Sequence, residues 1–337
     1  MNATENMLLL VTGGTGLVGS HVIERARQEG LRVRAFVRRS SNVKLLQKWD
    51  VEWVLGSMTE PYALKSALNG VTHVVHCAAM VGDWGNIKHY RQVNVEGLES
   101  FLEAARECDT LTRFVQISSL GVYPAGHHYG TDESTPLSAQ GIDAYTQSKI
   151  EAEDVLRDYV KRERVPALAL RPGFIYGPRD RTVLPRIIER MREGKASYIG
   201  DDQTLLNNTY VGNLVDAVFL ALDRHDLVGE FFNIRDERLV TKREFFETIA
   251  ELGGLPKPTR EIPLGLAKPL ATVWEWVWRT IGMESAPLLS QATVKFLGYN
   301  LEFSIDKAKK QLGYRPRVDF KEGMKTTMDW FRARKKV

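Results

Sequence analysis

Apolar stretches alternate with amphipathic ones through the first half of the chain. Short apolar runs typical of buried strands lie at 8–12, 32–37, 52–55, 73–77, 114–118 and 167–171. Helical periodicity lies between these runs, at about 17–29, 60–69, 90–107 and 143–163. Strands that alternate with helices predict a parallel sheet with helices on both faces. We therefore expect an α/β fold built on a doubly wound parallel sheet of the Rossmann type.

A glycine-rich turn joins the first predicted strand to the first predicted helix. Gly13 allows a tight turn, Gly16 lets the backbone approach phosphates, and Gly19 lets the helix pack closely on the strand. The free N–H groups at the helix start, together with the helix dipole, then face a pyrophosphate. With a strand before it and a helix after it, this turn predicts a dinucleotide site. Its residues are Gly13, Thr15, Gly16, Leu17, Val18 and Gly19.

The end of the second predicted strand bears on which dinucleotide is bound. A site specific for NAD normally has an acidic residue there to bind the ribose hydroxyls, whereas this chain has Val37 followed by Arg38 and Arg39. A guanidinium binds a 2′-phosphate, which a carboxylate would repel. The sequence therefore favours NADP as the cofactor, with NAD as the alternative. A solvated loop is the other interpretation of the two arginines.

Tyr145 and Lys149 stand four residues apart in a predicted helix and so share one face. A free phenol titrates near pH 10, and an ammonium beside it together with a nicotinamide cation favours the phenolate. We predict that Tyr145 moves a proton to or from a substrate oxygen, and that Lys149 assists it and binds the nicotinamide ribose. Ser119 follows the fifth predicted strand, at the edge where open α/β sheets bind ligands. Its hydroxyl could donate to the same oxygen; simple strand termination is the alternative.

Together these motifs resemble the extended short-chain dehydrogenases/reductases, also called the NAD-dependent epimerase/dehydratase family. The resemblance rests on the glycine turn, on Tyr145 with Lys149, and on the segments 76–79, 93–97 and 170–178. It implies a catalytic triad of Ser119, Tyr145 and Lys149, with Asn94 supporting a proton relay. It also implies cofactor contacts from Ser57, Met58, Cys77, Ala78, Ala79, Asn94, Ser118, Tyr145, Lys149, Pro172, Gly173 and Ile175. Ser57 is a departure, because the family usually has an aspartate there that contacts adenine.

Other segments resemble the branch of the family that contains 3β-hydroxysteroid dehydrogenases, sterol-carboxylate dehydrogenases, dihydroflavonol reductases and bacterial β-keto acid reductases. These segments are 81–85, 210–217 and 303–316. Phe174 and Leu206 stand where epimerases commonly carry an asparagine and an arginine, so two partners of a substrate diphosphate are missing. A buried diphosphate without partners would be costly. We expect an apolar substrate that contacts Val81, Trp84, Ser119 and Phe174; core packing is the alternative for Trp84 and Phe174.

The expected function is NAD(P)-dependent interconversion of a secondary alcohol and a ketone on a 3β-hydroxysteroid-, β-keto acid- or flavonol-like substrate. A nucleotide-sugar 4-epimerase or dehydratase is one alternative, because it would use the same residues. A non-catalytic NADP-binding sensor or scaffold is another. We expect residues 1–172 to form the NAD(P)-binding domain, with 208–235 returning to it. Residues 173–207 and 236–337 would form a smaller C-terminal α/β lobe that binds the substrate.

The remaining composition argues against other classes of protein. The net charge of +4 and the lack of a basic stripe with interleaved aromatic residues argue against nucleic acid. Cys77 and Cys108 lack metal-ligand spacing, so no metal site is predicted, and free thiols are typical of a reducing compartment. The N-terminus has no basic region typical of a signal peptide, and we expect a cytoplasmic protein. The family resemblance implies a homodimer formed through the helices at 90–107 and 143–163.

A segment with three tryptophans lies at 263–281. Helical spacing places Leu270, Val273, Trp274, Val277, Trp278 and Ile281 on one stripe. Its charged residues are too frequent for a transmembrane helix. We expect the stripe to pack within the second lobe; a lid over the substrate and weak contact with a membrane surface are the alternatives.

Overall fold

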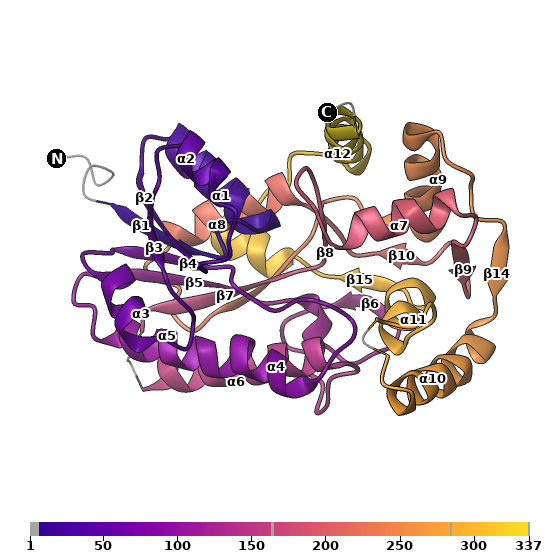
Figure 1. Cartoon of the computed structure of the whole chain (residues 1–337), viewed down its shortest axis with the longest axis horizontal. Coiled ribbons are helices and arrows are strands. Elements are labelled where there is room, and N and C mark those ends of the chain that lie inside the picture. Colours follow the sequence, from indigo (N-terminus) through magenta and orange to yellow (C-terminus); the bar gives the residue numbers. More distant parts are fainter. Residues whose placement is uncertain (1–6, 163–164, 284, 336–337) are drawn as a thin grey trace.

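The computed structural model describes residues 7–162, 165–283 and 285–335. Its centre is a parallel sheet of seven strands in the order β12-β7-β5-β4-β1-β2-β3 (Figure 1). The strands are β1 (Leu8–Thr12), β2 (Arg32–Val37), β3 (Glu52–Leu55), β4 (His73–His76), β5 (Arg113–Ile117), β7 (Ala167–Pro172) and β12 (Phe231–Ile234). The order reverses between β1 and β4, and open sheets of this kind bind ligands beyond the carboxyl ends of the strands at such a point.

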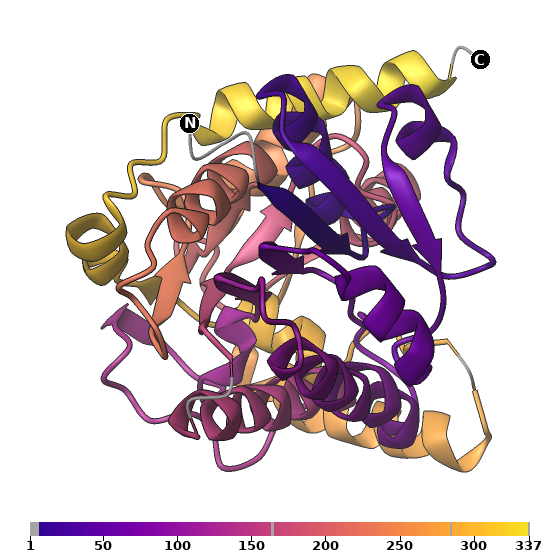
Figure 2. The same ribbon diagram turned by 90° about the vertical axis from the view of Figure 1, so that its left-hand side faces the viewer.

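Helices cover both faces of the sheet, as Figures 1 and 2 show. One layer contains α1 (Leu17–Gln28), α2 (Lys44–Lys48) and α8 (Val211–Leu222); the other contains α3 (Pro61–Leu68), α5 (Gly97–Arg106) and α6 (Ala144–Lys161), with α4 (Ile87–Arg91) beside α6. Two separate apolar cores result, because each strand sends alternate side chains to opposite faces. Val22 and Leu214 are fully buried in the first core, and Leu64 and Phe101 in the second. The prediction of a doubly wound sheet is confirmed.

The helix predicted at 90–107 is interrupted by a turn of π-helix. Gln92–Glu96 forms this turn, named η1, between α4 and α5. Such turns are rare and often lie at functional sites. Asn94 lies within it and is buried.

The rest of the chain builds a smaller lobe from short strands and helices. Its elements are η2 (Leu120–Val122), β6 (His128–Thr131), β8 (Phe174–Tyr176), α7 (Val183–Arg192), β9 (Ser197–Ile199), β10 (Leu205–Leu206), β11 (Asn208–Tyr210), β13 (Val240–Thr241), α9 (Lys242–Gly253), β14 (Arg260–Ile262), α10 (Leu264–Thr280), α11 (Gln291–Gly298), β15 (Leu301–Phe303), η3 (Ala308–Leu312) and α12 (Phe320–Lys335). The strands pair two by two, as β8 with β11, β9 with β14, β6 with β15, and β10 with β13. Leu184, Phe245 and Met324 are fully buried in the apolar core of this lobe. η3 is the exception, because its residues Ala308 and Leu312 are buried in the first core of the central sheet.

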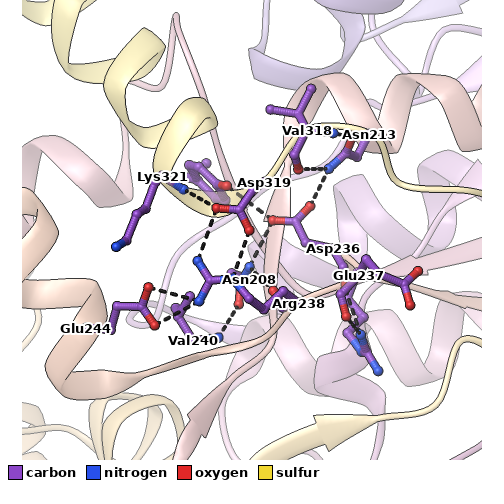
Figure 3. A network of polar contacts seen from close by, with 12 residues as sticks. Asn208, Asn213, Asp236, Glu237, Arg238, Val240, Glu244, Val318, Asp319 and Lys321 are labelled. Atoms are coloured by element: carbon purple, nitrogen blue, oxygen red, sulfur yellow. Dashed lines mark hydrogen bonds and ion pairs between the residues drawn. The ribbon is translucent and has the colours of Figure 1, made fainter.

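A buried carboxylate ties the lobe to the segment that returns to the sheet (Figure 3). Asp236 accepts hydrogen bonds from Nδ2 of Asn208 at 2.9 Å, from Nδ2 of Asn213 at 2.8 Å and from the backbone of Tyr210 at 2.8 Å. Asn213 also bonds both backbone polar groups of Val318, ahead of α12. Burial raises the pKa of Asp236 to about 6, although these donors oppose the shift. Asp236 and Asn213 together therefore join β11, the start of α8 and the segment before α12.

Four of the six residues of the predicted α10 stripe are exposed, whereas Val277 and Trp278 are half-buried, so the stripe as a whole does not pack within the lobe. Leu270 is 45% exposed, Val273 57% and Ile281 62%. The face that packs on the lobe instead carries Ala267 and Ala271, which are fully buried. Small side chains let α10 lie close to α11, and the large apolar residues then fall on the opposite side. Within the described residues, no helix is long and apolar enough to cross a bilayer.

Candidate active site

The glycine turn between β1 and α1 has no room for side chains. Gly13 has a φ of +66°, and a Cβ there would lie 2.8 Å from the backbone nitrogen of Ala78. A Cβ on Gly19 would lie 2.5 Å from the carbonyl oxygen of Gly13. Gly16 precedes α1 and supplies no side-chain cap, so the first N–H groups of the helix keep their capacity to bind an anion. This cradle fits a dinucleotide pyrophosphate, with Leu17 and Val18 opening the helix.

The ends of β1 and β4 form the neighbouring wall of this cradle. Thr12 Oγ1 lies 2.8 Å from Nδ1 of His76 and accepts a hydrogen bond of 3.1 Å from the backbone of Ala78. Burial raises the pKa of Cys77 to about 12, so its thiol stays protonated. The predicted cofactor residues Cys77, Ala78 and Ala79 thus follow the carboxyl end of β4, beside the glycine turn.

Further predicted cofactor residues follow β2, β3 and β7. Arg38 and Arg39 come directly after β2, and both are exposed. Ser57 and Met58 follow β3. Met58 is buried against the start of α5, where a Cβ added to Gly97 would lie 2.8 Å from the Cβ of Met58. At the carboxyl end of β7 lie Pro172, Gly173 and Ile175.

Tyr145, Ser119 and Lys149 come together beyond the carboxyl end of β5. The Ser119 hydroxyl lies beside the Tyr145 phenol, close enough to oppose the rise in its pKa. Lys149 donates from Nζ to the carbonyl oxygen of Ile117 at 2.9 Å, and Nζ lies 5.9 Å from the centre of the Tyr145 ring. Burial raises the pKa of Tyr145 to about 12, with Ser119 opposing the shift, and burial lowers the pKa of Lys149 to about 8. The phenol is therefore protonated at neutral pH, with a donor and a cation beside it.

Asn94 links the helix that bears Tyr145 to the loop after β4. Its Oδ1 accepts from the backbone of Met80 at 2.7 Å, and its Nδ2 donates to Oγ of Ser148 at 2.8 Å. Ser148 in turn donates to the carbonyl oxygen of Tyr145 at 2.7 Å. The π-turn directs this amide beneath the site, where it holds the backbone that carries Tyr145.

A buried ion pair lies behind the site, and the sequence analysis missed it. Glu153 accepts two hydrogen bonds from Arg171, at 2.8 Å and 2.6 Å. Ser118 donates to the same carboxylate at 2.6 Å. Glu153 stands four residues, or about one helical turn, after Lys149, so both lie on the same buried face of α6. This spacing could have identified Glu153 from the sequence.

Lys295 on α11 is a second residue that the sequence analysis missed. Its Nζ donates to the carbonyl oxygens of Gly121 at 2.8 Å and Tyr123 at 3.1 Å. Gly121 in turn donates from its backbone to Oγ of Ser119 at 3.0 Å. Burial lowers the pKa of Lys295 to about 8, while Asp143 opposes the shift. A cation from the far part of the chain therefore holds the turn that positions Ser119.

The residues predicted to contact substrate divide into two groups. Val81 is 54% exposed, and Trp84 donates from Nε1 to the carbonyl oxygen of Met283 at 2.9 Å, just after α10. The Phe174 ring instead packs 5.6 Å from that of Phe245 and 5.0 Å from that of Phe296, measured between ring centres. Trp84 thus lies in the loop beside α10, and Phe174 packs against the core of the lobe, as the alternative interpretation expects.

A match to a protein-family model identifies the family of this chain. Residues 9–234 match the model of the NAD dependent epimerase/dehydratase family. The chain belongs to this family. The matched region runs from the first strand to the end of β12, so it contains the glycine cradle, Ser119, Tyr145 and Lys149. The resemblance drawn from the motifs is confirmed, and nicotinamide dinucleotide is the family's cofactor.

Relatives of this family member are reductases and dehydrogenases. It is 30% identical to the 2-alkyl-3-oxoalkanoate reductase of Shewanella oneidensis, over 94% of this chain and 84% of that protein. It is 31% identical to the decarboxylating sterol-4-alpha-carboxylate 3-dehydrogenase of Saccharomyces cerevisiae, over 96% of this chain and 97% of that protein. The crystal structure of gox2253 matches with a TM-score of 0.83 at 30% identity, covering 98% of this chain and 99% of that one. The prediction of a dehydrogenase or reductase of the extended short-chain type is confirmed.

Proposed function

We propose that this chain interconverts a secondary alcohol and a ketone on a largely apolar substrate. The observation that carries the proposal is that the Ser119 hydroxyl and the Lys149 cation both lie beside the Tyr145 phenol, with the glycine cradle at the same sheet edge. The nicotinamide, when bound, supplies or accepts the hydride. Tyr145 gives a proton to the carbonyl oxygen during reduction and takes it back during oxidation. Ser119 binds the same oxygen, which orients the substrate and stabilises the developing charge.

The surroundings of Phe174 and Leu206 support an apolar substrate rather than a nucleotide sugar. Leu206 is fully buried in the core of the lobe, and Phe174 packs against the same core. Neither position can pair with a diphosphate. The similar reductase and dehydrogenase are named for an alkyl oxoalkanoate and a sterol carboxylate. We infer a β-keto acid-like or 3β-hydroxysteroid-like substrate, with a flavonol-like one as the remaining member of this class.

We also propose that the chain prefers NADP to NAD. Arg38 and Arg39 are exposed at the carboxyl end of β2, and no acidic residue takes the place of Val37. Two guanidinium groups there suit a 2′-phosphate. Arg38→Ser combined with Arg39→Ser should raise the KM for NADP about tenfold or more and leave the KM for NAD within about twofold. A larger change for NAD than for NADP would contradict this preference.

The proposed reaction is tested by nicotinamide absorbance with purified protein. Each cofactor is offered with hydroxysteroids, β-hydroxy acids and UDP-sugars, and the reverse reaction with the matching ketones. Tyr145→Phe should lower the rate with an apolar substrate by about 10² to 10⁴. Tyr129→Phe is the matched control, because Tyr129 is 73% exposed on β6. A UDP-sugar converted without net oxidation would favour the epimerase, and tight cofactor binding with no turnover would favour the sensor.

Three further expectations accompany this proposal. A homodimer through α4, α5 and α6 is inferred from the family resemblance and is tested by sedimentation equilibrium. Cys77 and Cys108 are free thiols, which supports a cytoplasmic location. The assignment of residues 173–207 and 236–337 to substrate binding is tested by mapping a bound substrate analogue.

A further inference from the structure

Three lysines in the described part of the chain have a pKa that burial lowers. They are Lys149, Lys242 and Lys295. A lysine ammonium has three N–H donors. Lys242 has three protein acceptors for them, a side-chain hydroxyl at 3.3 Å and two backbone carbonyl oxygens at 3.2 Å and 2.6 Å. The protein therefore satisfies this ammonium completely, as a structural role requires.

The other two lysines have fewer protein acceptors. Within the described residues, Lys149 donates only to the carbonyl oxygen of Ile117, which leaves donors for the nicotinamide ribose that the family resemblance implies. Lys295 donates to the carbonyl oxygens of Gly121 at 2.8 Å and Tyr123 at 3.1 Å. By the same count, Lys295 keeps one donor for a ligand.

The charge of Lys295 also lacks a direct partner. It forms no ion pair with the described residues, and Asp143 is the acid that opposes the fall in its pKa. The Oδ1 of Asp143 is itself occupied by the backbone N–H of Thr146, at 2.7 Å. At neutral pH the ammonium is charged, because burial lowers its pKa only to about 8. A half-buried cation without an ion pair is costly, and a bound anion would offset that cost.

Lys295 lies one residue away from the hydroxyl that binds the reacting oxygen in the proposed reaction. The backbone N–H of Gly121 donates to Oγ of Ser119 at 3.0 Å, and the carbonyl oxygen of Gly121 accepts from Nζ of Lys295. In a β-keto or β-hydroxy acid, two C–C bonds, or about 2.5 Å, separate the reacting carbon from the carboxylate carbon. A substrate of this class therefore carries its negative charge close to the atom that Ser119 binds, on the scale of one residue.

We propose that the ammonium of Lys295 binds the carboxylate of a β-keto or β-hydroxy acid whose reacting oxygen lies on Ser119. This inference rests on the proposed function and selects the acid from its substrate classes, because a simple 3β-hydroxysteroid or a flavonol has no such anion. A hydrogen bond from an ammonium to a carboxylate is charge-assisted and stronger than a neutral one. One cation suits a carboxylate rather than a diphosphate, for which Phe174 and Leu206 offer no partner.

The experiment measures binding to a complex that cannot react. The full chain is saturated with reduced dinucleotide, and 3-hydroxydecanoate or its methyl ester is titrated in by calorimetry; an alcohol cannot accept the hydride. Lys295→Met and Lys295→Gln remove the charge, the second keeping an N–H donor for the carbonyl oxygens, and Lys295→Arg retains the charge. The matched control Lys310→Met removes a lysine charge from an exposed position of η3. Circular dichroism and the Kd for the dinucleotide check that each variant is folded.

We expect the wild-type chain to bind the acid at least about tenfold more tightly than the ester. The two neutral variants should weaken binding of the acid about tenfold or more and leave the ester within about twofold. Lys295→Arg should keep most of the preference for the acid, and Lys310→Met should match wild type. Equal weakening of acid and ester in the neutral variants overturns the proposal, because Lys295 then only holds the turn that carries Ser119. Acid and ester that bind the wild type equally, or that both fail to bind, overturn it as well.

The reduced complex does not turn over, so these outcomes are separate from the proposed reaction. Oxidation of acid and ester with equal kcat/KM by the oxidised dinucleotide, lost in Tyr145→Phe, would support the reaction and overturn the carboxylate site. Binding of the acid through Lys295 without oxidation of any alcohol would support the site and overturn the reaction.

Discussion

The Nζ of Lys149 donates a hydrogen bond of 2.9 Å to the carbonyl oxygen of Ile117, the last residue of β5. Ser119 follows Ile117 by two residues, and its hydroxyl lies beside the phenol of Tyr145. The same strand end therefore positions both the cation and the hydroxyl that act on Tyr145. A buried lysine held in this way stabilises the phenolate only while it keeps its own proton.

We expect ketone reduction to decline above about pH 8. Burial lowers the pKa of Lys149 to about 8, so the lysine loses its charge as the pH rises through that value. Loss of the cation makes the Tyr145 phenol, whose pKa burial raises to about 12, a weaker acid. Lys149→Met should reduce kcat/KM by about 10² near neutral pH and remove the decline above pH 8. The measurement is kcat/KM against pH at saturating cofactor; a decline that persists in Lys149→Met would assign it to another group.

Gly19→Ala should weaken dinucleotide binding without unfolding the chain. The added Cβ would lie 2.5 Å from the carbonyl oxygen of Gly13, so the turn that faces the pyrophosphate has to shift. We expect the Kd for the dinucleotide to rise at least about tenfold, or about 1.4 kcal/mol, by isothermal titration calorimetry. Gly126→Ala is the matched control, because a Cβ there meets nothing within 4 Å. Equal binding by both variants would show that the turn does not hold the phosphates.

The sequence predicted the parts of the fold that local patterns determine. All six predicted strands agree with the structure to within one residue at each end, because buried parallel strands are continuous apolar runs bounded by turns. The meeting of Ser119, Tyr145 and Lys149 was predictable for a related reason. The carboxyl ends of parallel strands share one edge, and the glycine turn had already identified that edge.

Arg171 and Glu153 should be strongly coupled in stability. Arg171→Met removes two hydrogen bonds from the buried Glu153 carboxylate, leaves it with the partly exposed Arg157 as its cation, and should cost about 3 kcal/mol of unfolding free energy. The double variant Arg171→Met/Glu153→Leu should recover more than half of that loss, since no unpaired charge remains. Urea denaturation of the two single variants and the double variant measures the coupling. If the unfolding free energy lost in the double variant equals the sum of the losses in the two single variants, the two side chains do not interact specifically.

Asp236 should make the stability of the fold depend on pH. Burial raises its pKa from the usual 3.8 to about 6, so between these values the folded chain holds a proton that the unfolded chain has lost. This contribution to stability is complete below about pH 4 and is lost as the pH rises through about 6. The unfolding free energy of wild type minus that of Asp236→Asn should therefore fall by about 2 kcal/mol between pH 4 and pH 7. If the difference in unfolding free energy between wild type and Asp236→Asn stays constant or increases with pH, burial does not destabilise the charged form of this carboxylate.

Three features lay beyond the reach of sequence patterns. The stripe on α10 was read correctly as one helix face, but its direction depends on which face the lobe can bury, and Ala267 with Ala271 packs more closely. Lys295 reaches Gly121 across 174 residues of chain, so no local spacing reveals the contact. The π-turn that buries Asn94 interrupts a continuous helical pattern without a proline or glycine at its centre.

The most direct test of the proposed chemistry follows deuterium from the reduced nicotinamide into the product. Purified protein is given the deuterated dinucleotide and an apolar β-keto acid or 3-ketosteroid, and the product is analysed by mass spectrometry, with Tyr145→Phe beside it. We expect one deuterium on the new carbinol carbon in the wild type, and product formation reduced by about 10² to 10⁴ in the variant. Product without deuterium, or equal transfer by Tyr145→Phe, would contradict the assignment of hydride transfer assisted by Tyr145.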